Sequence, residues 1–315
     1  MLKQVIEVME LIDDASVSGD KVKAFFAERG LGDVSTLTVK GEQGSTDFIK
    51  ILVRGREGKA VGGDALTLGV IGRLGGLGVR PEMIGMVSDA DGAATALAVA
   101  LKLADMRVKG DVLDGDVIIS THICPNAPTE PHDPVPFMGS PVDMQTMNKM
   151  EVNPAMDAIL SVDTTKGNKI LNERGFAITP TIKDGFILKV SESLLDIMEV
   201  VTGKPPVVLA ITMQDITPYG NGIYHLNSIV QPCTATSAPV VGVAITTQVP
   251  VPGCATGASH EVDIELASRF VVEVAKAFGR GTCKFFDERE CETMTALYGS
   301  MEHLKTLGKQ NHVPN

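Results

Sequence analysis

Short apolar runs of strand length alternate along this chain with longer segments of helical periodicity, and this alternation limits the fold more than any other feature. Residues 240–246 read Val-Val-Gly-Val-Ala-Ile-Thr, a composition that suits a strand covered on both faces. Residues 116–120 and 159–162 are similar, shorter runs. Strands that alternate with helices predict an α/β fold, in which a mixed, mainly parallel sheet carries helices on both faces.

Apolar spacing, glycines and turn residues place the remaining elements. Further strands are expected at 36–40, 48–53, 83–87, 187–190 and 207–212. Helices are expected at 1–12, 21–29, 93–106, 192–202 and 261–278. We expect residues 1–280 to form a single α/β domain with a small insertion at about 170–235, followed by a C-terminal helical extension at 281–315.

The composition is that of a globular protein with an aliphatic core. Hydrophobic residues make up 44% of the 315 residues and charged residues 21%, and there is no Trp, which excludes a disordered chain. The net charge of −11 argues against broad binding to nucleic-acid phosphates, which needs basic surfaces. Five cysteines without a Cys-x-x-Cys pair indicate reduced thiols.

The sequence also indicates the cellular location and the kinds of partner to expect. The chain shows neither the apolar core of a signal peptide nor an apolar run of membrane-spanning length, so we expect a cytoplasmic protein that does not bind membranes. We further expect a homo-oligomer that takes a small-molecule or peptide substrate and no nucleic acid.

Polar side chains follow four of the expected strands. They are Asp89 and Asp91 after 83–87, His122 and Cys124 after 116–120, Asp163 after 159–162 and His260 beyond 240–246. In open α/β sheets, sites form at the carboxyl ends of strands. Carboxylates and imidazoles together suit zinc or another late first-row divalent ion. Each of these residues also has a simpler role open to it, as a turn residue or a helix cap.

A proline-rich loop at 121–143 follows the strand at 116–120. Its six prolines restrict the backbone and reduce the entropy cost of ordering it. We therefore expect the loop to be ordered beside Asp89 and His122. It also carries Glu130 and Asp133, either of which could act as a proton acceptor. The chain has no Gly-x-Ser-x-Gly motif and no P-loop, which disfavours a serine hydrolase or a P-loop nucleotide site.

The best-marked segments of the chain are VGGDALTLGVIGRLGGLGVRPE, VSDADGAA and THICPNAPTEPHDPVPFMGSPVD. In these segments the whole chain resembles an uncharacterised prokaryotic family of unknown function. More distantly, residues 1 to about 280 resemble the co-catalytic zinc aminopeptidases, which have a phosphorylase/hydrolase-like fold. The resemblance begins at the turn Ser18-Gly19-Asp20 between the first two helices. It implies a sheet of the zinc-aminopeptidase type.

The resemblance to the zinc aminopeptidases also implies roles for several residues. Asp89 or Asp91 looks like the bridging aspartate that opens an alanine-rich helix. Asp163 looks like a later aspartate ligand, and His260 like the final histidine ligand.

Two positions depart from that family's pattern. Where the family has His-x-Asp, this chain reads Gly62-Gly63-Asp64, which leaves Asp64 alone as a candidate catalytic residue. Where the family has paired glutamates, the chain reads His122-Ile123-Cys124-Pro125. His122, Cys124 or His132 could supply a replacement ligand, and Glu130 or Asp133 the missing base.

These observations lead to one expected function and two alternatives. The first is a metal-dependent hydrolase with an altered metal site, acting on a peptide, amide or amino-acid derivative, with bound zinc lowering the pKa of a water molecule. The second is a non-catalytic protein that binds a small ligand or acts as a scaffold. The third is an isomerase or lyase on the same fold, since a fold alone does not fix a function.

Overall fold

A single mixed sheet forms the centre of the protein in the computed structural model, which describes residues 1–166, 170–211 and 228–306. Within these residues nine strands join this sheet, in the order β1-β2-β4-β3-β7-β11-β9-β10, and β8 pairs with β11. The strands are β1 Val34–Gly41, β2 Gly44–Val53, β3 Leu68–Gly72, β4 Val117–Ile123, β7 Ala158–Thr164, β8 Gly175–Ile178, β9 Ile182–Lys183, β10 Phe186–Ile187 and β11 Val240–Thr246.

The four central strands β4, β3, β7 and β11 are parallel, whereas β1, β2 and β8 run antiparallel to their neighbours. From β3 the chain continues to β4 on one side, and from β7 it continues through β8, β9 and β10 to β11 on the other. The onward connections of these two adjacent strands therefore leave in opposite directions. Such a switch point in an open α/β sheet leaves a crevice at the carboxyl ends of the strands, where ligands bind.

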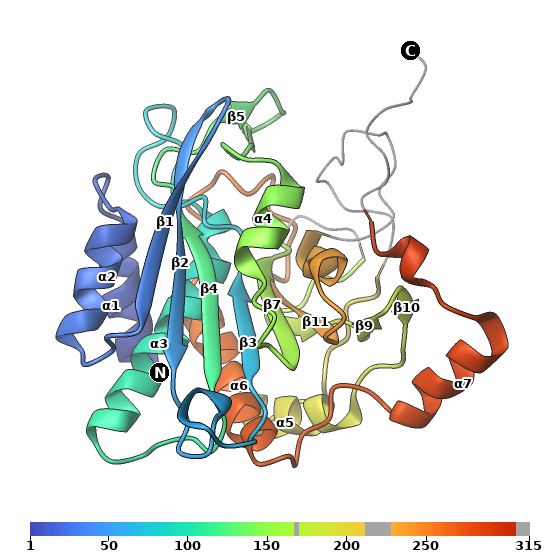
Figure 1. The fold of residues 1–315 in the computed structure, drawn as a ribbon. Helices are drawn as coiled ribbons and strands as arrows, with labels where there is room; N and C mark the ends of the chain where they lie inside the picture. The colour runs from blue at the N-terminus through green and yellow to red at the C-terminus, as the bar shows by residue number, and fades with distance from the viewer. Residues whose placement is uncertain (167–169, 212–227, 307–315) are drawn as a thin grey trace.

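Helices cover both faces of the sheet, as Figure 1 shows. One face carries α1 Leu2–Ile12, α2 Gly19–Glu28, α3 Asp91–Val108, α5 Glu192–Thr202 and α6 Glu261–Gly279. The other face carries α4 Met144–Glu151 and the 3-10 helix η3 Ser228–Ala235. The larger apolar core lies under the first group, and a second core lies between the sheet and η3.

Helix α3 is buried on nearly all sides, because α1 and α6 pack on it from outside and the sheet lies beneath it. Its alanines let these neighbours approach closely, and a helix that is apolar all round belongs in an interior. Gly92 fixes its first turn against the sheet, since a Cβ atom there would lie 1.9 Å from Arg73 O and 2.5 Å from Val162 O. The start of α3 is therefore held directly over the ends of β3 and β7.

The structure confirms most of the helices and strands predicted from the sequence. It also confirms the predicted α/β class, with a mixed, mainly parallel sheet. The strand predicted at 83–87 is wrong, because Gly85 has a φ of +85° and Ile84 is 92% exposed. The strand β3 lies instead in the glycine-rich segment before it. The strand predicted at 207–212 is reduced to a bridge between Val208 and Ile178, and its last residue lies outside the described residues.

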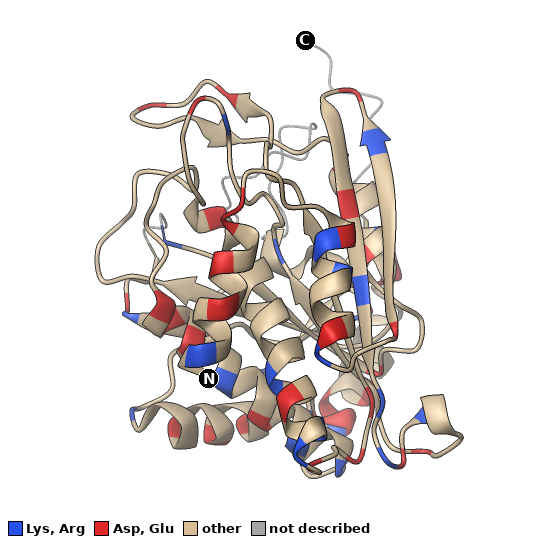
Figure 2. Cartoon of the chain, turned by 90° about the vertical axis from the view of Figure 1, so that its left-hand side faces the viewer, with Lys and Arg blue, Asp and Glu red and all other residues tan. Residues whose placement is uncertain are grey.

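The C-terminal part contains α7 Glu288–Tyr298, which buries none of its residues and projects beside the sheet (Figure 1). The predicted division into a domain and an extension at residue 280 stays a prediction. Figure 2 shows acidic and basic positions interspersed on the side where α1 and α2 lie. Among the described helices, none is long and apolar enough to cross a membrane.

Candidate functional site

Three aspartates gather at the carboxyl edge of the sheet. Asp163 lies near the end of β7, Asp89 in the 3-10 turn η2 Ser88–Ala90, and Asp91 at the first position of α3. All three side chains are buried. We call Asp89, Asp91 and Asp163 the acidic cluster. It lies beside the switch point between β3 and β7, where the sheet topology favours a site.

Asp89 is held by the segment that follows β11. Its backbone N–H donates to Cys254 O at 3.2 Å, and the neighbouring Ser88 donates to Thr256 O and Cys254 O. Burial raises the pKa of Asp89 well above its usual range, and the nearby charge of Asp163 raises it further. Two adjacent carboxyl groups in a site of low polarity do not both ionise readily. Burial and the neighbouring Asp163 therefore favour the protonated form of Asp89.

Asp91 carries a different set of contacts. The Lys166 ammonium forms a buried ion pair with Asp91 Oδ2, and Ser259 Oγ donates to Oδ1 at 2.5 Å. Lys166 Nζ also donates to Ala258 O at 2.6 Å. Burial raises the pKa of Asp91, while Lys166 and Ser259 act in the opposite direction. Both oxygens of Asp91 thus have partners within the chain.

Asp163 is connected to a buried arginine through Ser228. Ser228 Oγ donates to Asp163 Oδ2 at 3.4 Å, and Ser228 O accepts from Arg73 Nη1 at 2.7 Å. Arg73 follows β3 directly, is fully buried, and pairs with Glu151 of α4 at 2.9 Å and with Asn148. The register of β3 on β7 pairs Gly72 with Val162, so Arg73 and Asp163 continue that pairing side by side. Arg73 and Ser228 together fix the position of the Asp163 carboxylate.

His260 reaches the same edge but lies at its surface. It precedes α6, its side chain is 52% exposed, and its Nδ1 lies 3.5 Å from Asp263 Oδ2. It is one of the groups that lower the pKa of Asp91. The immediate partner of His260 is therefore Asp263, and its role as a ligand stays a prediction.

His122 is committed to the structure through both ring nitrogens. Its Nδ1 lies 2.9 Å from Thr46 Oγ1, which donates to Ile123 O, and its Nε2 accepts from Gly75 N at 2.9 Å. Thr46 must therefore receive its hydrogen bond from Nδ1, and the ring is neutral. Burial and the charge of Arg73 lower the pKa of His122 to about 3. No ring nitrogen is left for a metal in this arrangement.

The proline-rich loop is described throughout and packs beside Asp89, as predicted. Its residues Cys124, Ala127 and Met138 share a small apolar cluster with Val79, Val87 and Ala255. Gly76 lies between this loop and the acidic cluster. A Cβ atom at Gly76 would come within 2.4 Å of Met138 Cε and 3.2 Å of Asp89 Oδ2. The loop thus forms one wall beside Asp89.

The candidate bases and spare ligands of the loop lie elsewhere. Glu130, His132 and Asp133 are exposed, and His132 Nδ1 lies 3.1 Å from the nearby Val135 O. Cys124 is buried with its Sγ 3.9 Å from Ser45 O, and burial raises its pKa to about 11. These positions do not support Glu130 or Asp133 as the base, or His132 or Cys124 as a metal ligand.

Asp64 is not part of this site. It is exposed and precedes β3, so it lies at the amino edge of the parallel strands, whereas the acidic cluster lies at the carboxyl edge. The position directly after β3 is held by Arg73 instead. Asp64 was a candidate only through the resemblance, which matched Gly62-Gly63-Asp64 to the His-x-Asp of the zinc aminopeptidases.

A zinc ion does not fit the residues as they are arranged. In the described parts of the chain, no group of three or more His, Cys, Asp or Glu side chains is placed to hold a metal ion. Ligands of one zinc ion must all come within roughly 2.0–2.3 Å of it. Asp91 is occupied by Lys166 and Ser259, His122 by Thr46 and Gly75. The expected metal centre is therefore not assembled.

Sequence reasoning missed Arg73, Lys166, Ser228 and Ser259. Lys166 follows Asp163 by three residues, and a lysine so close to a strand end was a usable signal. Ser259 precedes His260, which was singled out alone. Arg73 gave no signal, because an arginine beside glycines in the sequence reads as an exposed loop residue.

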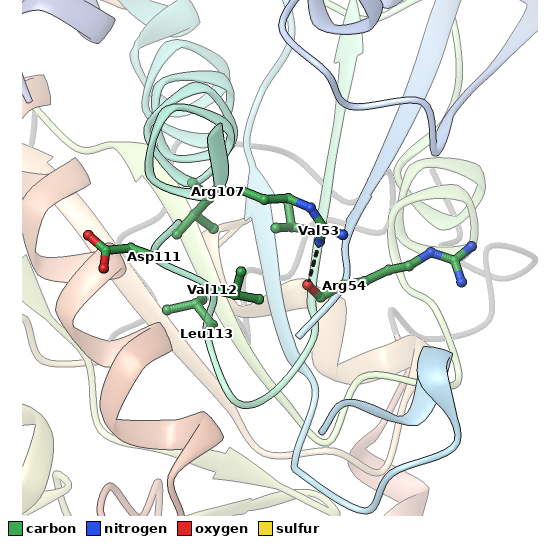
Figure 3. Close-up of a pocket in the computed structure, with 7 residues that line it drawn as sticks. Val53, Arg54, Arg107, Asp111, Val112 and Leu113 are labelled. Atoms are coloured by element: carbon green, nitrogen blue, oxygen red, sulfur yellow. Dashed lines mark hydrogen bonds between the residues drawn. The ribbon is translucent and has the colours of Figure 1, made fainter. Parts of the chain in front are cut away.

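A small hollow lies far from this site. Figure 3 shows it lined by Val53, Arg54 and residues around the end of α3, with Arg107 donating to Arg54 O at 2.9 Å. Because α3 begins at the acidic cluster and ends at this hollow, the two are separated by the length of the helix.

Among solved structures, the fold is similar to the LapA aminopeptidase of Legionella pneumophila, with a TM-score of 0.47 and 11% identity over 91% of this chain and 72% of that one. A likeness at that level says nothing about the chemistry of the site. No curated protein matches the sequence. A family model described as a protein of unknown function, DUF1177, matches residues 37–308. Since this match spans most of the chain, the protein belongs to the DUF1177 family.

Proposed function

We propose that the protein is a hydrolase acting on a peptide, amide or amino-acid derivative, and that Asp89 and Asp163 carry the proton transfers. One observation supports this proposal most: two buried carboxyl groups at the switch point influence each other, and the pKa of Asp89 is raised well above its usual range by burial and by Asp163. Carboxyl pairs whose environments separate their protonation states are typical of acid–base sites. The substrate class comes from the resemblance to zinc aminopeptidases.

In this proposal Asp163 acts as the base and Asp89 as the acid. The Asp163 carboxylate accepts a proton from a water molecule as the water oxygen bonds to the substrate carbonyl carbon. The proton on Asp89 passes to the carbonyl oxygen. The carbon–nitrogen bond then breaks, and the leaving nitrogen takes the proton held by Asp163 while the restored carbonyl returns a proton to Asp89. Ser228 and Arg73 position Asp163 for the first transfer.

An activity screen on aminoacyl amides and short peptides tests this proposal. The purified protein is treated with EDTA and assayed beside the variants Asp89→Asn and Asp163→Asn. We expect turnover that survives EDTA and falls at least about 100-fold in each variant, since general acid–base groups contribute typically 10²–10⁴-fold. Asp64→Asn is the matched control, because Asp64 is an exposed aspartate at the opposite edge.

Three outcomes would contradict the proposal. Turnover that EDTA abolishes and zinc restores would favour the metal-dependent mechanism. Turnover unchanged in both variants would remove Asp89 and Asp163 from the chemistry. Binding of these compounds without turnover would favour the non-catalytic alternative.

A further inference from the structure

The positive charge beside Asp91 comes from the chain itself. The side chains of Lys166 and Asp91 are 2% and 0% exposed, and their charged groups are in direct contact. Lys166 lies just beyond β7, and Asp91 opens α3, so the ion pair joins two elements of the carboxyl edge. A buried lysine is uncommon unless a partner offsets the loss of hydration.

We infer that the Lys166 ammonium takes the place of a divalent cation beside Asp91, so that the acidic cluster is stabilised by the protein's own charge and not by a bound metal. This inference concerns charge and binding, and it does not depend on the hydrolase proposal. It explains why the ligand set expected from the sequence is not assembled although three buried aspartates are present.

Three contacts support the assignment of Lys166. The ammonium pairs with Asp91 Oδ2, and Ser259 occupies Oδ1 at 2.5 Å. Ala258 O accepts a further hydrogen bond from Nζ at 2.6 Å, which fixes the ammonium from the side of the loop before α6. A metal ion at Asp91 would have to displace this ammonium, and the two positive charges would repel each other in a site that water does not screen.

Removing the ammonium should turn the acidic cluster into a cation site. In Lys166→Met the side chain keeps a similar length but loses its charge, and Asp91 remains buried without a counter-ion. Uncompensated buried carboxylates either take up protons or bind a cation. Oxygen donors from carboxylates suit Mn²⁺ or Mg²⁺ better than softer ions, so Mn²⁺ is the probe to use.

The experiment measures Mn²⁺ binding by titration calorimetry and melting temperature with EDTA or with Mn²⁺ for the wild type, Lys166→Met and Lys50→Met. We expect the wild type to bind no Mn²⁺ and to melt at the same temperature in both conditions. Lys166→Met should melt about 10 °C lower in EDTA, as expected for a broken buried pair, and recover at least half of that loss with Mn²⁺. Lys50 is half-buried against Val152 O on the other face of the sheet, so its variant should not respond to Mn²⁺.

Two results would overturn the inference: a wild-type protein that binds Mn²⁺ stoichiometrically, or a folded Lys166→Met variant that does not bind Mn²⁺, whether or not it loses stability. If Lys166→Met does not fold, the double variant Asp91→Asn, Lys166→Met decides the question. With both charges removed, the double variant should fold and ignore Mn²⁺. Its failure to fold would show that Lys166 acts through packing, which contradicts the inference.

Discussion

The carboxyl groups of Asp89 and Asp163 come from a turn before α3 and from the end of β7, and the charge of one raises the pKa of the other. The strand and helix propensities of the sequence do not explain why these two carboxyl groups lie close together. It arises because Gly92 lets α3 begin directly over β3 and β7. The arrangement gathers these carboxyl groups at the carboxyl ends of the strands, where the sheet topology favours a ligand site.

The first prediction concerns stability and Asp89. Its pKa is raised in the folded state, so folding is opposed as pH rises from the unfolded pKa near 3.9 toward the folded value. Asp89→Asn removes this cost. The variant should be more stable than the wild type at pH 7 to 8, and the difference should shrink toward pH 4. Urea unfolding at several pH values measures it, and a variant that is less stable at every pH would contradict the assignment.

The second prediction concerns Arg73. Arg73→Met would leave Glu151 buried without its partner, and breaking a buried ion pair in this way costs about 3–5 kcal/mol. Guanidinium unfolding should show a loss of that size. The double variant Arg73→Met, Glu151→Met should recover much of it.

The control for Arg73 is Arg56, which pairs with Asp114 at 2.8 Å but is 59% exposed. Exposed pairs contribute roughly 0–1 kcal/mol, so Arg56→Met should change stability little. Equal losses in the two arginine variants would mean that the buried network around Asp163 is not specially stabilising.

The third prediction concerns acid stability and His122. Its folded pKa of about 3 lies below the usual value of 6.5, so its contribution to stability is complete above pH 6.5 and is lost as pH falls toward 3. Stability should decline by up to about 1.4 kcal/mol per pH unit in this window from His122 alone. In His122→Gln this part of the decline should disappear. An unchanged acid profile in the variant would show that the ring is not held neutral.

The fourth prediction compares two glycines. Gly92→Ala should destabilise the protein by more than about 2 kcal/mol, because its Cβ atom would overlap two backbone oxygens and overpacking typically costs 1–3 kcal/mol or more. At Gly257 nothing lies within 4 Å of an added Cβ, so Gly257→Ala should be nearly neutral. Thermal unfolding of both variants tests the close approach of α3 to the sheet.

The fold was largely predictable from the sequence because the buried parallel strands are continuous apolar runs. β7 and β11 show this pattern clearly, and α6 follows β11 with helical periodicity. α3 stands out in the sequence as a long alanine-rich segment. β3 escaped detection because it begins and ends among glycines. Residues 83–87 were misjudged because their apolar side chains suggested a strand, whereas Gly85 at a φ of +85° turns the chain.

The site was predictable in part. Asp89, Asp91, Asp163 and His260 share one edge, because each follows a strand or opens a helix at the carboxyl ends. What the sequence could not show is which partner each side chain takes. His122 lies at the right strand end, yet Thr46 and Gly75 bind both its ring nitrogens. Lys166 stands where a metal was expected, and its partner Asp91 lies far away along the chain.

The most direct test of the proposed function is the pH dependence of kcat/KM for hydrolysis of an aminoacyl amide by the EDTA-treated wild type. The account predicts that kcat/KM falls as pH rises, because Asp89 loses the proton it donates, and that Asp89→Asn shows a low rate without this decline. A wild-type rate that rises with pH to a plateau would point to a bound hydroxide as the nucleophile, and it would contradict the role given to Asp89.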